Sequence, residues 1–281
     1  MRAIKENKNA LTCFKAYDVR GELGVNFDAS IAYKIGRAVA QHLSAKVIVV
    51  GRDARQSSPE LAKALISGIT DSGANVLDIG LSGTEEMYWA VTEFNACAGI
   101  EVTASHNPIN YNGLKFVKLG SQPLNFEKDF QVIKKLAELS NWDFKGSGGS
   151  VKDVSLLARG AYVKKVLSFI NFCEFKSHKI IVNSGNGAAG PTFDAIADVL
   201  KNNEVPIEFI RMHHDVDHTF PNGIPNPLLI ENHAPMRDMV LEHGADFGIA
   251  FDGDFDRCFF FDEKGTFVSG EYIVGLLASA F

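Results

Sequence analysis

Short blocks of apolar and polar residues alternate along the first half of the chain. Each block has a run rich in β-branched residues, then a turn containing glycine, then a segment with apolar residues at helical spacing. The pattern predicts strands within 45–55, at 74–80 and at 97–105, with helices at 57–73 and 84–95 between them. Strands that alternate with helices are typical of an α/β fold with a mixed, mostly parallel sheet.

A cluster of glycine and serine at 141–153 interrupts the alternation and is interpreted as a linker. The alternation then resumes, with helices predicted at 154–170, 188–203 and around 230–243, and strands at 179–185, 207–212 and 245–251. We therefore expect consecutive α/β domains, the first covering residues 1–148 and the second covering residues 149–256.

Residues 257–281 are predicted to begin a third domain. A hairpin with its turn at 262–265 is followed by an amphipathic helical segment that reaches the last residue. A domain rarely ends on an unfinished apolar helix, so we expect a truncated chain.

Composition and charge exclude some classes of partner. Hydrophobic residues make up 46% of the 281 residues and the net charge is −6, which is ordinary for a globular protein and unsuited to binding a polyanion. No apolar run approaches the roughly 18 residues that span a bilayer, and the N-terminal segment lacks the apolar core of a secretory signal. Four cysteines without a CxxC pair suggest buried, reduced thiols. We expect a cytoplasmic protein that binds neither nucleic acid nor membrane, and its oligomeric state stays open.

Three aspartates alternate directly after the predicted strand at 245–251. Asp252, Asp254 and Asp256 would repel one another unless a cation lies among them, and a hard cation such as Mg²⁺ suits three carboxylates. The spacing also fits a calcium EF-hand, with Glu263 at the twelfth position. That interpretation fails because Arg257 occupies the sixth position, where the loop needs glycine, and because strands rather than helices are predicted on both sides.

The stretch GIEVTASHNP places Ser105 and His106 in a tight turn just after a strand. A serine hydrolase is disfavoured, because neighbouring residues on an extended chain point to opposite sides and the G-x-S-x-G motif is absent. The alternative is that Ser105 carries a phosphoryl group beside the metal. Arg20, Lys115 and Arg257, all expected at strand ends, would supply the positive charge that phosphoryl transfer needs.

Two other motifs leave alternatives open. Gly185, Gly187 and Gly190 form G-x-G-x-x-G between a strand and a helix, which allows a nucleotide-dependent oxidoreductase, although an ordinary tight turn is favoured. His213, His214 and His218, with Asp215 and Asp217, could hold Zn²⁺, but the Pro/Asn/Gly run after them favours a solvated loop.

Three stretches together resemble the α-D-phosphohexomutase family: FKAYDVRG at 14–21, TASHNP at 103–108 and DGDFDR at 252–257. The resemblance runs from about Leu11 to the last residue, and the sequence between the three stretches looks most like that of bacterial phosphomannomutases. It implies the consecutive α/β domains of that family. It also implies that the G-x-G-x-x-G is a structural turn of the second domain.

The resemblance further implies which residues act. Ser105 would be the phosphoserine that donates a phosphoryl group to the sugar phosphate and later reclaims one. Asp252, Asp254 and Asp256 would hold Mg²⁺ together with an oxygen of the phosphorylated Ser105. Arg257 would steady the phosphoryl group.

The remaining implied roles surround the serine. Arg20 and Lys115 are the candidates for acid/base or phosphate-contact roles, and Tyr17 would line the active site. His106 and Asn107 would shape the phosphoserine loop. The implied reaction converts mannose 6-phosphate to mannose 1-phosphate for GDP-mannose synthesis, through a hexose 1,6-bisphosphate that also serves as activator.

The chain departs from the family in its length. Family members have four domains around a cleft, and the third and fourth supply the loops that grip the sugar hydroxyls and the distal phosphate. This sequence would contain two domains and the start of a third, so full turnover is not expected. A phosphoglucomutase of the same mechanism, or a phosphosugar- or metal-binding fragment without turnover, remains an alternative.

Overall fold

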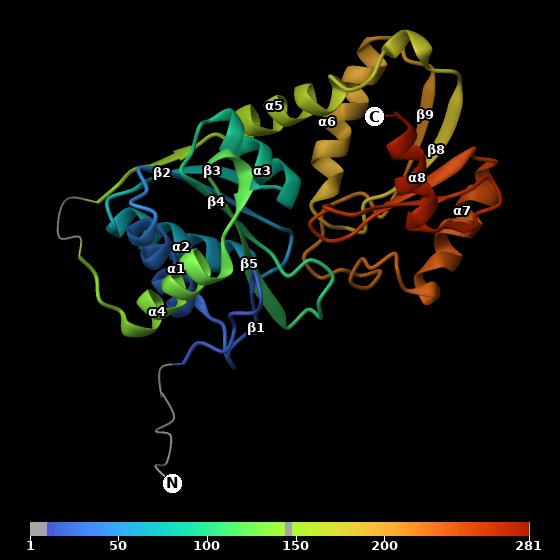
Figure 1. Cartoon of the computed structure of the whole chain (residues 1–281). Helices are drawn as coiled ribbons and strands as arrows, with labels where there is room; N and C mark the ends of the chain where they lie inside the picture. The colour runs from blue at the N-terminus through green and yellow to red at the C-terminus, as the bar shows by residue number, and fades with distance from the viewer. Residues whose placement is uncertain (1–9, 144–147, 281) are drawn as a thin grey trace.

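The computed structural model describes residues 10–143 and 148–280, which form two α/β units, each built on its own sheet (Figure 1). The first sheet has the strand order β1-β5-β4-β2-β3-β7, and β6 pairs with β5 at its side. Its strands are β1 (Val19–Glu22), β2 (Val47–Arg52), β3 (Asn75–Leu81), β4 (Ala98–Val102), β5 (Tyr111–Lys118), β6 (Gln122–Pro123) and β7 (Val151–Asp153). Strands β4, β2, β3 and β7 are parallel, whereas β1, β5 and β6 pair antiparallel.

Helices cover both faces of this sheet. Helices α1 (Ala29–His42), α2 (Ser58–Asp71) and α4 (Gln131–Leu139) pack on one face, and α3 (Thr84–Glu93) and α5 (Ser155–Leu167) pack on the other. Asp28 caps α1 by accepting a hydrogen bond from the backbone N of Ile31 at 2.8 Å, and Pro59 lies in the first turn of α2. Both helices bury one apolar stripe, which supplies most of their stability.

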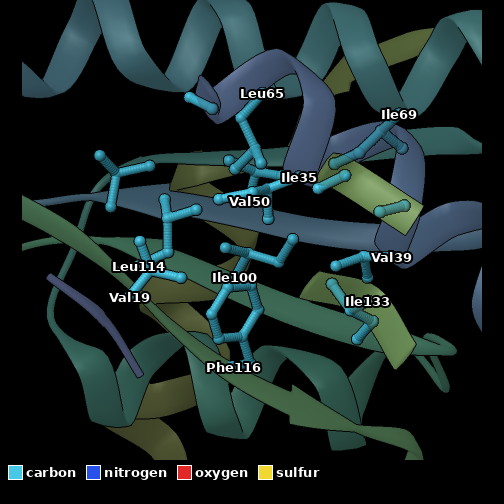
Figure 2. Close-up of a cluster of buried hydrophobic side chains, with 14 of the residues drawn as sticks. Val19, Ile35, Val39, Val50, Leu65, Ile69, Ile100, Leu114, Phe116 and Ile133 are labelled. Atoms are coloured by element: carbon cyan, nitrogen blue, oxygen red, sulfur yellow. The ribbon is translucent and has the colours of Figure 1, made fainter. Parts of the chain in front are cut away.

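Figure 2 shows the core between α1, α2 and the sheet. Ile35 of α1 and Leu65 of α2 meet Val50 and Ile100 of the central strands, and none of these side chains is exposed. Strands buried on both faces read as continuous apolar runs, which is why β2 and β4 were predictable from sequence. The core therefore holds the carboxyl ends of β2 and β4 in a fixed frame.

The second sheet has the order β12-β11-β10-β8-β9. Its elements are β8 (His178–Asn183), α6 (Ala189–Asn202), β9 (Ile207–Met212), α7 (His233–His243), β10 (Phe247–Phe251), β11 (Cys258–Phe261), β12 (Phe267–Val268) and α8 (Gly270–Ala280). Strands β8, β9 and β10 are parallel, and β10, β11 and β12 are joined antiparallel. Helix α5 links the units, because its Ala158 packs in the core of the first unit and its Val163 and Leu167 pack with Leu200 of α6.

The mixed α/β architecture and every predicted helix and strand named above are present, but both sheets extend beyond the predicted domain boundaries. Residues 144–147 of the predicted linker lie outside the described residues. The last three residues of that linker, 151–153, form β7, which pairs with β3. Likewise β11 and β12 continue the second sheet past residue 256. Pairing with a neighbouring strand decides such short segments, and local composition does not reveal it.

Two smaller expectations are corrected. Only Cys13 is buried, and Cys173 and Cys258 are exposed, so the apolar sequence around a thiol did not predict its burial. Helices α1 and α4 and strands β1, β5 and β6 were not predicted at all. In the part of the chain that the structure describes, no helix is both long and apolar enough to cross a bilayer.

Candidate active site

Ser105 lies in a turn that begins just after β4. Its φ is +50°, a left-handed conformation that costs a non-glycine residue on the order of 1 kcal/mol and is frequent at functional sites. The backbone N of Ser105 donates to Oγ1 of Thr103 at 2.8 Å, and the backbone N and Nδ2 of Asn107 both donate to the carbonyl of Ala104. These bonds hold the turn that carries Ser105.

The second half of the site is the loop between β10 and β11. Asp252 and Asp254 are buried, and Asp256 is half-buried. A Cβ at Gly253 would lie 2.7 Å from the carbonyl oxygen of Ser105, a distance that real Cβ atoms essentially never show. Glycine at this position therefore lets the aspartate loop of the second unit approach the serine turn of the first.

The two loops meet at the serine hydroxyl. Ser105 Oγ donates to Oδ2 of Asp252 at 2.6 Å and accepts from Nη2 of Arg257 at 2.9 Å. The same Nη2 donates to Oδ2 of Asp252 at 2.6 Å. A serine oxygen held between a carboxylate and a guanidinium is oriented for reaction, and the positive charge would bind a phosphoryl group placed there.

The imidazole of His106 is not directed away from the serine, so that prediction is wrong. Nδ1 of His106 lies 3.1 Å from Ser105 Oγ, because the left-handed φ of Ser105 breaks the extended alternation on which the expectation rested. Nδ1 also accepts from Arg257 Nη2. Burial and the neighbouring Arg257 lower the pKa of His106, so the ring is neutral at physiological pH.

The three aspartates fit a divalent cation. One oxygen from each lies within 4.8 Å of the other two, and Oδ1 of Asp254 is buried and has no hydrogen-bond partner among the residues that the structure describes. Burial and the charge of Asp254 raise the pKa of Asp252 to about 6. Hard carboxylate oxygens in this number suit Mg²⁺, and the strands on both sides confirm that the loop is not an EF-hand.

Lys115 lies against this carboxylate cluster. Its Nζ is 2.6 Å from Oδ2 of Asp254 and 2.6 Å from Oδ2 of Asp256. Burial alone would lower the pKa of Lys115, but the two carboxylates outweigh it and raise the pKa, so the amine holds its proton. Burial would likewise raise the pKa of Asp254, yet Lys115 lowers it below the ordinary value.

A cleft of about 480 Å³ opens in front of the serine, and the predicted residues Tyr17, Arg20, His106, Lys115 and Arg257 line it. Tyr17 is 79% exposed, and Nη2 of Arg20 pairs with Asp18 at 2.7 Å. Arg20 and Lys115 lie within β1 and β5 and not at strand ends as predicted, because neither of these two strands was recognised in the sequence.

Sequence reasoning missed the contacts that support the aspartate loop from the first unit. Thr84, the first residue of α3, donates from Oγ1 to Oδ2 of Asp254 at 2.7 Å, and its backbone N donates to the carbonyl of Asp254. Oε1 of Glu86 accepts from Oγ1 of Thr192 in α6 at 2.8 Å, which joins the two units beside the site. The available signal was that the SGTEE stretch follows the carboxyl end of a strand, where α/β sheets place ligands.

The G-x-G-x-x-G motif has a structural role, because its glycines allow close backbone packing. A Cβ at Gly187 would lie 2.9 Å from the carbonyl of Gly253, and one at Gly190 would collide with the backbone of His214. Protein backbone therefore fills the space that a dinucleotide pyrophosphate would need, and the motif supports the aspartate loop. The neighbouring histidines form no metal cluster among the described residues, and His214 instead pairs with Asp194 at 2.8 Å.

Each of the two units matches a known protein family model. Residues 12–141 match the family model for phosphoglucomutase/phosphomannomutase α/β/α domain I, and residues 160–265 match the model for domain II. A phosphomannomutase of Salmonella montevideo is 52% identical over 275 residues, which is 97% of this chain and 60% of the relative. Phosphohexose mutases of Xanthomonas campestris are 44% identical over 271 residues, or 96% of this chain and 59% of the relative.

A solved structure shares the fold. The crystal structure of a phosphoglucomutase/phosphomannomutase family protein from Burkholderia thailandensis has a TM-score of 0.84 and 31% identity, and the match covers 95% of this chain and 58% of that one. The chain thus spans about 60% of the length of the relatives that it matches.

Proposed function

The chain belongs to the phosphoglucomutase/phosphomannomutase family, and from that premise we propose that Ser105 is its phosphoryl carrier. The observation that supports this most directly is the 2.6 Å hydrogen bond from Ser105 Oγ to Asp252, made across 147 residues of sequence. A nucleophilic oxygen beside three carboxylates and an arginine is the arrangement that phosphoryl transfer requires.

The proposed transfer is balanced at the serine. In the forward step the bond between phosphorus and Ser105 Oγ breaks and a bond forms to a hydroxyl oxygen of the hexose phosphate. That hydroxyl's proton leaves, and the released Ser105 Oγ takes up a proton. The product is a hexose 1,6-bisphosphate. In the return step the other phosphoryl group goes back to Ser105 Oγ, the serine proton leaves, and the released sugar oxygen takes up a proton.

The aspartates Asp252, Asp254 and Asp256, with an oxygen of the phosphorylated Ser105, would hold Mg²⁺, which when bound supplies charge neutralisation for the phosphoryl group. Arg257, already 2.9 Å from the serine oxygen, would bind the phosphoryl oxygens.

The residues that line the cleft would bind the sugar phosphate and supply a proton. Lys115 holds its proton and would deliver it to the sugar oxygen that is released, and Arg20 would bind the substrate phosphate. His106 is neutral and would accept a hydrogen bond from Arg257 and so orient it. Tyr17 and Asn107 would contact the hexose phosphate and the serine loop, respectively.

We propose mannose 6-phosphate and mannose 1-phosphate as substrate and product, with a hexose 1,6-bisphosphate as activator, because relatives that are 52% and 50% identical over the aligned residues are phosphomannomutases. Glucose phosphates are the second candidate, since the family model covers both sugars. The free thiols suit a reducing cytoplasm. Mutase turnover is a separate proposal from phosphoryl acceptance, because the chain spans about 60% of those relatives.

The test is phosphopeptide mapping after incubation with Mg²⁺ and labelled mannose or glucose 1,6-bisphosphate. We expect label on Ser105 and its loss in Ser105→Ala, with the thermal midpoint measured to show that the variant folds. Label that persists in Ser105→Ala contradicts the assignment. A coupled assay for mannose 1-phosphate and glucose 1-phosphate turnover then separates the two sugars and tests whether this chain turns over.

A further inference from the structure

Arg55 is a buried arginine that faces the serine loop from behind. It follows β2 by three residues, and its side chain is 2% exposed. Nη1 donates to the carbonyls of Pro108 and Tyr111 at 2.9 and 3.1 Å, and Nη2 donates to those of Ser105 and Asn107 at 2.8 and 2.6 Å. All four terminal N–H groups of the guanidinium are therefore bonded to the backbone of one seven-residue loop.

The carboxylate of Asp53 fixes the arginine itself. Asp53 pairs with Nε of Arg55 at 3.4 Å and accepts from the backbone N of Arg55 at 3.0 Å. Oδ1 of Asp53 also accepts from Oγ of Ser58, whose oxygen in turn accepts from Nδ2 of Asn112 at 2.9 Å. The network runs from the carboxyl end of β2 through α2 to β5, so the guanidinium is anchored on the rigid part of the first unit.

The loop needs this anchor. The carbonyls of Ser105, Asn107 and Tyr111 face the buried guanidinium of Arg55. Ser105 is buried and the other two residues are half-buried, so a carbonyl left without a donor there is costly. Ser105 also holds a left-handed φ that its surroundings must maintain. Because Arg55 binds the carbonyl of Ser105 at 2.8 Å, it fixes the peptide whose rotation would carry Oγ away from Asp252.

We propose that Arg55 is a positioning residue that holds the Ser105–Tyr111 loop in its reactive shape through four carbonyl hydrogen bonds. Its functional consequence rests on the proposed role of Ser105 as phosphoryl carrier. Lysine cannot replace it, because an ammonium has three donors on one atom and no planar fork that reaches four carbonyls.

The experiment compares Arg55→Met and Arg55→Lys with Arg52→Met in the full chain. Arg52 is the matched control, because it lies at the same strand end and its side chain pairs with Asp78. Amide hydrogen exchange is followed by mass spectrometry over residues 103–113, which include the bonded amides of Ser105, Asn107 and Tyr111. Both Arg55 variants are expected to exchange at least about tenfold faster there, because each lost bond to a charged donor shifts local opening by that order.

The second readout is the labelling of Ser105 by hexose 1,6-bisphosphate. At saturating bisphosphate the initial rate is expected to fall about a hundredfold in both Arg55 variants, while the half-saturating concentration changes less than about threefold, since misplacing a nucleophile slows transfer without weakening binding. If the unmodified chain takes up no label, the proposed function fails by itself, and hydrogen exchange still decides the role of Arg55.

Several results would overturn the proposal. Unchanged loop protection in Arg55→Met would do so, and so would wild-type protection in Arg55→Lys, which would mean that only the charge matters. Equal loss of protection throughout the first unit, or the same loss in Arg52→Met, would indicate general destabilisation. Should Arg55→Met fail to fold, the Arg55→Lys result decides.

Discussion

Replacing Lys115 with methionine is expected to tighten divalent-metal binding. The ammonium lies 2.6 Å from an oxygen of each of Asp254 and Asp256, two of the three carboxylates that would hold the cation. Metal binding must therefore displace Lys115 or overcome its charge. Methionine keeps the length and apolar stem of the side chain and removes only the competing cation.

The size of the effect follows from the geometry. Charges about 4 Å apart attract by about 4 kcal/mol at an effective dielectric constant of about 20, and the 16% exposure of the lysine side chain justifies a value of that order. Water and other partners in the cleft recover part of this energy when the ammonium is displaced. If one third to two thirds of this attraction remains as a cost of metal binding, the Mn²⁺ dissociation constant falls by about ten- to a hundredfold when Lys115→Met removes it.

Isothermal titration with Mn²⁺ at pH 7.5 and fixed ionic strength measures the effect. Lys118→Met is the matched control: it removes the same charge from the same strand, but its ammonium pairs with Asp129 at 2.9 Å, away from the aspartate loop. Lys115→Arg keeps the positive charge and should not tighten binding. Unchanged or weaker binding in Lys115→Met would refute the competition, and equal tightening in Lys118→Met would attribute the effect to net charge.

Three further predictions concern the acidic groups. Asp254→Asn should weaken Mn²⁺ binding by more than about tenfold and reduce the metal-induced rise in thermal midpoint, since it removes a charged ligand, and calorimetry checks this. Because the pKa of Asp252 is raised to about 6, affinity should level off as the pH rises well above 6 and fall below pH 6, where metal binding must release the proton of Asp252; titrations at pH 5 to 8 would detect this. Burial raises the pKa of Glu101 well above its usual value, so ionisation opposes folding, and stability is lost as pH rises above about 4.5. Glu101→Gln should remove that loss in urea unfolding measured at pH 5 and pH 8, and equal pH slopes in the two proteins would contradict it.

Local sequence was sufficient for most of the framework. The apolar runs of β2, β4 and β8 and the amphipathic α2 and α6 carry signals within a few residues, because burial on a sheet or helix face imposes a fixed period. The Asp252, Asp254 and Asp256 cluster and the turn at Ser105 were likewise visible as short motifs, and their chemistry follows from their residue types.

Strand pairing and long-range contacts needed the tertiary structure. Strand β7 was taken for part of a linker because its three residues become a strand only by pairing with β3. The imidazole of His106 turns toward Ser105 because one residue has a left-handed φ, which no local pattern reported.

The site itself is a product of packing. Ser105 and Asp252 are 147 residues apart, and Lys115 and Asp254 are 139 residues apart, yet both pairs meet at 2.6 Å. The sequence by itself determined which chemical groups this protein contains and which local elements carry them. Only the tertiary structure decided which groups touch, because a hydrogen bond or ion pair depends on the relative orientation of two sheets that no single segment encodes.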